Sequence, residues 1–378
     1  MLKEAKKFIL ALSTLTGTII GVGFFSLPYL ALKSGILVIL AYFLILGFLV
    51  LALHLIFGKL ALITPDLKRS PGFARYHLGK RGEKIAYFSS IVGMSGAILA
   101  YLIVGGEFLA QIFGGKDSFW TLLYFFVGSI LIFFGIKKIS KMEFLALISF
   151  LLILFLVFFQ LKDSIRKENF FLSSPSSFFD LFLPYGPILF SFWGASLIPE
   201  IEEMLGGKKN YLKWVILTSI LISALIYLFF IYLILGVCGQ KTPDSGIVGL
   251  KTFLAPSLFK IFLFFGFLAT FTSFISLGLT LKKIFWYDLK IKKNTSFLLT
   301  CFPPLILYSM GIKKFIPVIS FVGGCCIGIE AILILLMYQN YLRKKEIKTK
   351  KFLVFPLISV FILGIIYQII YFFRENVF

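Results

Sequence analysis

Charged residues are scarce in this sequence of 378 residues. They make up 15% of the chain, whereas they make up roughly a quarter of an ordinary soluble domain. Hydrophobic residues reach 59%, and the mean hydropathy is +0.99. Uncharged apolar runs of about 18 to 25 residues recur along the whole chain, and each can cross a hydrocarbon core about 30 Å thick. These runs exclude a water-soluble fold and predict an all-α integral membrane protein.

Histidine and cysteine are also rare, with two and four residues. Cys238, Cys301, Cys325 and Cys326 lie in or beside apolar runs, and their spacing fits neither a disulfide framework nor a zinc site. We expect them to be packing residues. A membrane-embedded enzyme needs a nucleophile with a base, an Asp-rich metal site or clustered histidines, and the apolar runs contain none of these. The sequence therefore predicts a protein that is not an enzyme and has no resident cofactor.

Basic residues outnumber acidic ones, with 38 Lys and Arg against 17 Asp and Glu, which gives a formal net charge of +21. In a soluble protein this excess would suggest a nucleic-acid partner. Here the basic residues lie in the short connectors between apolar runs, where cytoplasmic loops of membrane proteins collect them. The charge therefore reports topology, and we expect no nucleic-acid partner.

Eleven membrane spans are predicted from the runs without charge. They cover residues 8–32, 36–57, 85–113, 119–136, 142–161, 181–205, 214–237, 259–281, 296–311, 315–341 and 352–373. The ninth contains Pro303 and Pro304, which a membrane helix tolerates where neighbouring helices satisfy the freed carbonyls.

Loop charge gives the orientation. With the N-terminus inside, 27 basic residues lie on the cytoplasmic side and 11 on the other, as the positive-inside rule requires. Omitting the ninth span would place the basic cluster at residues 343–351 outside. We therefore expect a multi-pass protein of the cell membrane with its N-terminus cytoplasmic and its C-terminus extracytoplasmic. Connectors 58–84 and 162–180 are too short to fold alone, and we expect a monomer in the lipid bilayer.

Two spans carry matching interruptions. The first contains three glycines in residues 17–23, followed by Pro28, and the sixth contains Gly194 followed by Pro199. Gly23 and Gly194 each precede their proline by five residues, and the two pairs are offset by 171. Glycine and proline both weaken a helix interior. A close-packing helix face explains the first glycine group alone, but the matching pair predicts two discontinuous helices.

The sixth span lies five spans after the first, and an odd offset inverts the orientation of the second copy in the membrane. The two interruptions therefore describe an inverted repeat. Paired Gly/Pro-interrupted segments in corresponding halves indicate the binding site of a secondary transporter. A helix unwound at mid-membrane leaves N–H groups free at the start of one half-helix and C=O groups free at the end of the other. A bound zwitterion, such as an amino acid, satisfies both.

Four segments of the sequence resemble a known family. They are GTIIGVGFFSLP in the first span, YLIVGGE in the third, GASLIPEI in the sixth and ATFTSFISLGL in the eighth. The chain is similar to the amino acid/auxin permeases and the hydroxy and aromatic amino acid permeases of the amino acid–polyamine–organocation superfamily, which have a LeuT-type fold. The resemblance implies a five-plus-five inverted repeat over residues 1–161 and 181–341, with an eleventh span and tail at 352–378. It also implies amino acid uptake driven by an ion gradient.

The resemblance places the substrate at the two interruptions. It implies that backbone N–H groups at Gly21, Val22 and Gly23 bind the substrate carboxylate at a half-helix N-terminus. The substrate ammonium then meets carbonyls of both interruptions, and an aromatic residue of the sixth span acts as a gate. The residues concerned are Ile19 in the first span and Phe190, Ser191, Phe192, Trp193 and Gly194 in the sixth. Most aromatic residues in a chain with 48 phenylalanines simply pack, so packing is the alternative for the gate.

A sodium site is predicted between the first and eighth spans. Residues i, i+3 and i+4 of a helix share one face, so the Ala269 carbonyl and the Thr272 and Ser273 hydroxyls converge. Carbonyls of Gly17 and Ile20 complete five oxygen ligands, as unwound carbonyls do for Na⁺ in transporters. The pattern resembles the sodium site of sodium-coupled relatives. The alternative is that the hydroxyls bond back to carbonyls of their own helix.

A few titratable residues lie inside apolar runs, where charge is costly and often functional. Glu330 is near the middle of the tenth span. Its carboxylate has two alternative roles, as a proton relay or in a structural hydrogen bond. Glu107 is near the outer end of the third span. Its carboxylate can either reach the lipid headgroups or act as a gate, and the first role explains its position as well as the second. We expect His54 to be a packing residue. Three glutamates, Glu200, Glu202 and Glu203, are expected to cap the following half-helix, with Lys208 and Lys209 as cytoplasmic partners.

The sequence thus predicts an ion-coupled amino acid symporter that works by alternating access, with sodium as the coupling ion. Three alternatives remain open: a proton-coupled permease, an exchanger, or an amino acid receptor of the same fold, which would keep the same discontinuous helices. A channel is disfavoured because repeated pore-lining motifs are absent.

Overall fold

The computed structural model describes residues 2–65, 69–135, 139–172, 175, 177–347 and 351–376, and the described chain is 88% helical. In chain order the α-helices are α1 (Leu2–Ile19), α2 (Leu27–Ser34), α3 (Ile36–Ile63), α4 (Ser70–Phe113), α5 (Asp117–Phe134), α6 (Ile139–Leu161), α7 (Phe178–Phe182), α8 (Tyr185–Phe192), α9 (Ile198–Leu205), α10 (Lys209–Cys238), α11 (Pro256–Lys283), α12 (Lys293–Ser309), α13 (Phe315–Phe321), α14 (Gly328–Lys344) and α15 (Lys351–Asn376).

Shorter helical turns join these helices. The 3₁₀ turns are η1 (Val22–Ser26), η2 (Lys162–Ser164), η3 (Lys167–Phe171), η4 (Ala195–Leu197), η5 (Gly239–Lys241) and η6 (Ile247–Thr252), and the π-helical turns are η7 (Ile284–Asp288) and η8 (Val322–Ile327). The prediction of an all-α fold is confirmed for the residues that the structure describes.

Each predicted span overlaps helical structure, and the first, sixth and tenth spans are each divided among several helices. Within the described ranges, nine helices are long and apolar enough to cross a membrane, and the bent pair of residues 4–19 and 22–34 makes a tenth. The predicted ninth span, 296–311, lies on α12, which has 17 residues and holds both Pro303 and Pro304. The third span differs most, because α4 begins at Ser70 rather than near residue 85 and continues across a kink at Gly79.

Large apolar side chains cover the outside of the molecule. Leu44 and Phe48 on α3 are 76% and 74% exposed, and Phe134 on α5 and Leu363 on α15 are 78% and 66% exposed. Water would penalise these surfaces, and exposed apolar patches of this extent mark an interaction surface. These apolar faces are stable in contact with lipid. The protein is a multi-pass membrane protein. The four cysteines are free and buried, as expected.

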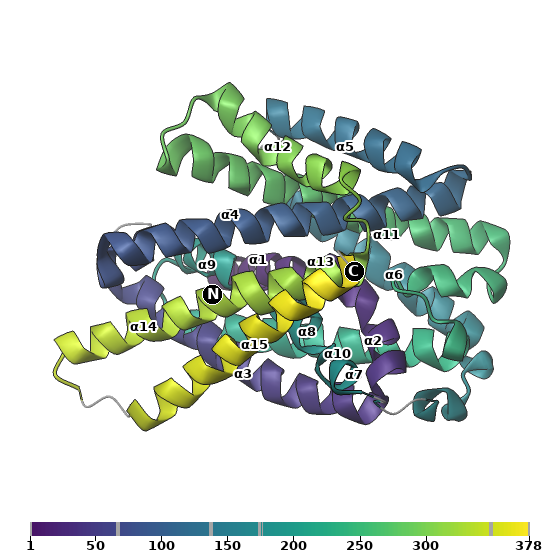
Figure 1. Cartoon of the computed structure of the whole chain (residues 1–378), viewed down its shortest axis with the longest axis horizontal. Helices are drawn as coiled ribbons and strands as arrows, with labels where there is room; N and C mark the ends of the chain where they lie inside the picture. Colours follow the sequence, from purple (N-terminus) through teal and green to yellow (C-terminus); the bar gives the residue numbers. More distant parts are fainter. Residues whose placement is uncertain are drawn as a thin grey trace.

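The helices run roughly along one common direction (Figure 1). α4 crosses the molecule and packs against α5, α11 and α14, while α5 and α12 lie along one edge (Figure 1). α1 is internal and packs against α10, α9 and α6. α15 packs on α13 and α14. The arrangement leaves the ends of α1 and α8 at the centre of the helix bundle.

Both predicted discontinuities are present. α1 ends at Ile19, and the chain resumes as η1 and then α2, with a bend of 48°. α8 ends at Phe192, and the chain resumes as η4 and then α9. Pro28 and Pro199 each occupy the first turn of the resuming helix, where a missing N–H costs nothing. We call residues 20–21 the first break and residues 193–194 the second break.

Glycine allows the second discontinuous helix to approach its neighbour. A Cβ atom on Gly323 in η8 would lie 1.9 Å from the carbonyl oxygen of Gly186 in α8, so any larger residue would push the two helices apart. The π-helical turn η8 interrupts the predicted tenth span beside this contact. It places Glu330, three residues after its end, in the wall of the central cavity.

Candidate functional site

A cavity of about 170 Å³ lies between the two breaks. A single water requires roughly 15 Å³ measured in the same way, so the cavity has room for a small organic molecule. Its walls come from the two breaks and from α1, η1, α4, α8, η4, α9, α11, η8 and α14. The lining residues are Thr18, Ile19, Gly21, Gly23, Ser89, Ser90, Gly93, Met94, Ala97, Tyr101, Phe190, Ser191, Trp193, Ser196, Leu197, Glu200, Ser273, Ser276, Leu277, Thr280, Val322, Cys326, Ile327 and Glu330.

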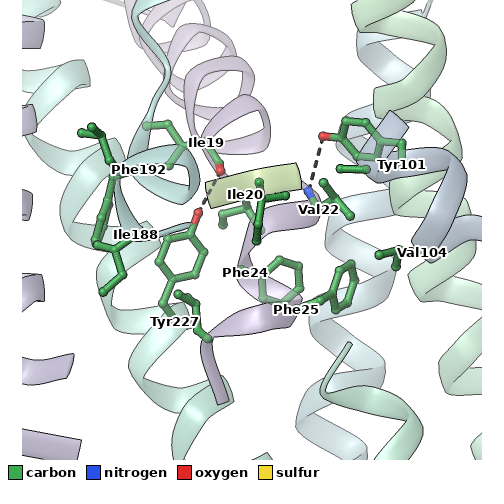
Figure 2. Packing of buried hydrophobic residues seen from close by; sticks show 14 of the residues in the cluster. Ile19, Ile20, Val22, Phe24, Phe25, Tyr101, Val104, Ile188, Phe192 and Tyr227 are labelled. Atoms are coloured by element: carbon green, nitrogen blue, oxygen red, sulfur yellow. Dashed lines mark hydrogen bonds between the residues drawn. The ribbon is translucent and has the colours of Figure 1, made fainter. Parts of the chain in front are cut away.

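At the first break, two tyrosines contact the backbone. The hydroxyl of Tyr227 on α10 lies 2.8 Å from the carbonyl oxygen of Ile19, and the hydroxyl of Tyr101 on α4 accepts a long hydrogen bond of 3.4 Å from the N–H of Val22 (Figure 2). Tyr227 is fully buried. These two phenols hold the chain on either side of the break, at the last carbonyl of one half-helix and the first N–H groups of the next.

Tyr227 also contacts the second discontinuous helix. Its hydroxyl lies 2.7 Å from the carbonyl oxygen of Ser191, as well as 2.8 Å from that of Ile19. A phenol has one proton, so it donates to one carbonyl at a time. Both carbonyls were predicted to meet a substrate ammonium. The Ile19 carbonyl also accepts the N–H of Gly21 at 2.8 Å, so both of its lone pairs are occupied whenever Tyr227 donates to it. Tyr227 therefore joins the two breaks within one hydrogen-bonding centre.

At the second break, an imidazole contacts the backbone. The N–H of Gly194 donates to Nε2 of His54 on α3 at 2.9 Å, and Nδ1 of His54 lies 2.8 Å from the carbonyl oxygen of Val50. His54 is 0% exposed. The expectation of a packing residue missed this partner, because His54 and Gly194 are 140 residues apart in the chain.

One carboxylate in the cavity wall has two donors. Glu330 accepts a 2.9 Å hydrogen bond from the indole N–H of Trp193 and a 3.2 Å hydrogen bond from the hydroxyl of Ser90. No ion pair of Glu330 occurs among the residues that the structure describes. Its position between α4, the second break and α14 is compatible with both alternatives given for it, a relay and a structural hydrogen bond.

The side of the cavity beyond η1 is closed by aromatic side chains. Phe24 and Phe25 pack on Phe230 and Phe108 with ring centroids 4.8 and 5.2 Å apart, and Figure 2 shows both phenylalanines directly after the first break. The loop after α10 covers this cluster, because a Cβ on Gly246 would lie 2.7 Å from the carbonyl oxygen of Phe25. The cavity thus extends instead towards the ends of α9 and α11, the side predicted to be cytoplasmic.

The predicted sodium ligands lie beside a second, smaller cavity. This cavity has a volume of about 10 Å³, and Ile20 and Gly21 of the first break and Ala269 and Thr270 of α11 belong to its lining. The first and eighth predicted spans therefore approach each other at the predicted level. The volume is close to what one water-sized sphere needs.

The predicted hydroxyl ligands point in different directions. The hydroxyl of Thr272 lies 3.0 Å from the carbonyl oxygen of Leu268 and 3.2 Å from that of Ala269, on its own helix. Ser273 lines the large cavity. Gly17 faces Leu147 of α6. The back-bonding alternative describes Thr272 in this conformation, and the five-oxygen site stays a prediction.

The structure separates the predicted substrate residues into two groups. Ile19, Gly21, Gly23, Phe190, Ser191 and Trp193 line the large cavity, whereas Val22, Phe192 and Gly194 are buried behind it. Phe192 packs edge-on against Tyr227, with ring centroids 5.3 Å apart. Of the three gate candidates, Phe190 and Trp193 are therefore in the cavity wall and Phe192 is a packing residue.

The remaining acidic residues have other partners than expected. Lys208 pairs with Glu4 rather than with the glutamates of α9. Glu200 lies in the first turn of α9 and lines the cavity, and its buried Oε2 has no hydrogen-bond partner among the described residues. Lys208 is therefore not its partner in this conformation, and capping of α9 by the three glutamates stays a prediction. Glu107 accepts a 3.1 Å hydrogen bond from Ser245 in the loop after α10. Among the described residues, no group of three His, Cys, Asp or Glu side chains could hold a metal ion.

Comparison with known proteins places these features in a family. A sequence model of the tryptophan/tyrosine permease family matches residues 4–372. The chain belongs to this family. The resemblance to hydroxy and aromatic amino acid permeases is thus confirmed, and this permease is not an enzyme. No curated protein has a sequence that matches it.

Solved structures share the fold of this permease. MhsT in complex with L-phenylalanine has a TM-score of 0.66 and 13% identity, covering 96% of this chain and 97% of its own. Mhp1, a nucleobase-cation-symport-1 family transporter in a closed conformation with bromovinylhydantoin bound, has a TM-score of 0.65 and 14% identity, covering 98% and 93%. A mutant of the manganese transporter of Eremococcus coleocola has a TM-score of 0.57 and 12% identity, covering 97% and 95%. The permease has the LeuT fold and is a secondary transporter.

Proposed function

We propose that this permease carries an aromatic amino acid into the cell by symport with sodium. The observation that carries the proposal is the cavity between the two breaks, which combines backbone groups for a zwitterion with a wall for an apolar side chain. Gly21, Gly23, Ile19 and Ser191 lie at one part of the lining. The matched family and the L-phenylalanine bound to MhsT support an aromatic substrate.

The two ends of the substrate are bound by different groups in this proposal. The backbone at Gly21 and Gly23 binds the carboxylate, together with the hydroxyl of Tyr101, which accepts the N–H of Val22 at 3.4 Å. For this, the N–H of Gly21 leaves its present acceptor, the Ile19 carbonyl oxygen at 2.8 Å. A glycine permits such a close approach because it has no side chain. The ammonium binds the carbonyl of Ser191 beside Tyr227, and it binds the carbonyl of Ile19 when Tyr227 donates to Ser191.

The side chain of the substrate lies against α4 and η8. Met94, Ala97 and Val322 provide apolar contacts there, and Gly93 lines the cavity beside them. Glu330 and its donors occupy the same part of the wall. Burial of an aromatic ring against such a wall contributes on the order of 2 kcal/mol.

Proton coupling through Glu330 is the second candidate, favoured by the placement of this carboxylate in the cavity wall. In the sodium proposal, the ion binds beside the small cavity between Ile20 and Ala269, with the hydroxyls of Thr272 and Ser273 turned towards it. The two candidates differ in which ion gradient drives uptake.

A thermal-shift screen of the purified permease against the twenty amino acids, with sodium or choline chloride, tests the binding step. The proposal expects the largest stabilisation from aromatic amino acids, with an additional shift in sodium. Stabilisation by aliphatic or charged amino acids alone would contradict the substrate class. An equal shift in both salts would contradict the sodium site.

A further inference from the structure

The orientation of His54 follows from its two partners. The Val50 carbonyl oxygen only accepts hydrogen bonds, so Nδ1, 2.8 Å away, carries the imidazole proton. Nε2 then has a free lone pair, and the Gly194 N–H points at it from 2.9 Å. Both ring nitrogens are thereby satisfied in the neutral imidazole, and only one tautomer fits.

The Gly194 N–H needs such a partner. α8 ends at Phe192, so this N–H lies outside the helical ladder at the second break. It is buried with its residue, and a buried N–H without a partner is costly. Substrate, water or a side chain can supply the acceptor. Here a side chain from α3 supplies it, so this N–H is occupied before any substrate arrives.

The repeat relates His54 to the tyrosine at the first break. The offset of 171 that joins Gly23 to Gly194 carries His54 to Leu225, two residues before Tyr227. His54 on α3 accepts from the N–H of the second break, and Tyr227 on α10 donates to the last carbonyl of α1 at the first. Each half of the chain thus provides one polar side chain for the break in the other half, although the two side chains differ by two residues in register.

His54 also contacts the side chain next to the break. Its ring lies edge-on to the indole of Trp193, with centroids 5.2 Å apart and an interplanar angle of 81°. Trp193 lines the cavity and donates to Glu330. The backbone of Gly194 and the ring of Trp193 are therefore both held against one buried imidazole.

We propose that His54 is a positioning residue for the substrate site. By accepting the Gly194 N–H it fixes the conformation of the second break, and this conformation presents Trp193 and the Ser191 carbonyl to the cavity. The N–H of Gly194 is then no ligand of the substrate, contrary to the sequence prediction for this residue. The effect on uptake rests on the proposed function, whereas the hydrogen bond itself does not.

Two variants separate this role from simple packing. In His54→Gln, the amide oxygen can take the place of Nε2 and accept the Gly194 N–H. In His54→Leu, a side chain of similar bulk lacks any acceptor. Hydrogen exchange of the peptide that spans residues 190–197 reads the hydrogen bond without any substrate, and the peptide across residues 17–24 is the internal control. Uptake of L-tryptophan into proteoliposomes then gives KM and the maximal rate for each variant.

We expect His54→Leu to speed exchange at the second break at least tenfold and to raise KM about tenfold, and His54→Gln to restore both towards wild type. Wild-type exchange in His54→Leu would overturn the hydrogen bond. Faster exchange with unchanged KM, or a loss of maximal rate alone, would overturn the positioning role. If the wild-type permease takes up no aromatic amino acid, the proposed substrate fails. The exchange result then still decides whether His54 accepts the Gly194 N–H, and KM is measured with whichever amino acid is transported.

Discussion

The indole N–H of Trp193 donates a 2.9 Å hydrogen bond to the carboxylate of Glu330. Trp193 belongs to the second break and Glu330 to α14, the helix that follows the π-helical turn η8. This contact joins the segment predicted to bind substrate to the one carboxylate predicted near the middle of a span. A change in the conformation of the second break must therefore change the hydrogen bonding of Glu330.

Glu330→Gln tests whether this carboxylate carries the coupling proton. The amide oxygen can still accept from Trp193, so we expect substrate binding to weaken less than about tenfold. In the sodium account, both the sodium dependence and the pH dependence of uptake persist in the variant. Uptake measured across external pH, with Glu107→Gln as the matched carboxylate control, decides this. Loss of the pH dependence in Glu330→Gln alone would assign the coupling proton to Glu330.

Gly23→Leu is expected to abolish uptake. A Cβ on Gly23 would lie 2.6 Å from Cδ1 of Phe190 and 2.6 Å from Oγ of Ser191, so the leucine side chain must occupy the space between the two breaks. Gly47→Leu on α3 is the control, because a Cβ there has no neighbour within 4 Å. Both variants should reach the membrane and elute as single species. Wild-type uptake by Gly23→Leu would show that the substrate does not bind at the first break.

Tyr227→Phe removes the hydroxyl shared by the two breaks. The carbonyls of Ile19 and Ser191 then lose the single donor that they share in a buried environment, which costs about 1–3 kcal/mol. We expect a lower melting temperature in detergent and reduced uptake. Tyr232→Phe, on the same helix but 44% exposed, should change neither. Equal melting temperatures for the two variants would mean that the Tyr227 hydroxyl contributes no stability.

Thr272→Ala combined with Ser273→Ala tests the sodium ligands. The two substitutions remove both side-chain oxygens of the proposed site, so sodium should no longer stimulate uptake. Ser13→Ala with Thr14→Ala is the control pair, because these hydroxyls also bond back to carbonyls of their own helix. An unchanged sodium response in the Thr272 and Ser273 variant would contradict the sodium site.

The positions of both breaks could be predicted from sequence because their causes are local. Glycine weakens a helix wherever it occurs, and Pro28 and Pro199 can each start a helix but not continue one. The partners of the breaks could not be predicted in this way. Tyr227 and His54 reach the breaks from helices far away in the chain, and an isolated tyrosine or histidine in an apolar run looks like a packing residue.

The offset of the two breaks gives little sequence signal for these partners. It carries His54 to Leu225, two residues before Tyr227, and residues two apart do not share a helix face. The π-helical turn η8 and the closure by the loop at Gly246 have no such signal, because both depend on packing between distant helices. The pairing of Lys208 with Glu4 rather than with α9 likewise depends on where α1 begins.

Uptake of L-tryptophan into proteoliposomes at fixed pH tests the central claim most directly. The permease is reconstituted without internal sodium, and uptake is compared between an inward sodium gradient and an equal concentration of choline. We predict accumulation above the external concentration only with the sodium gradient, and its loss when the gradient is dissipated with a sodium ionophore. Undiminished accumulation in choline would contradict sodium coupling, and no uptake of any aromatic amino acid in either salt would contradict the proposed substrate.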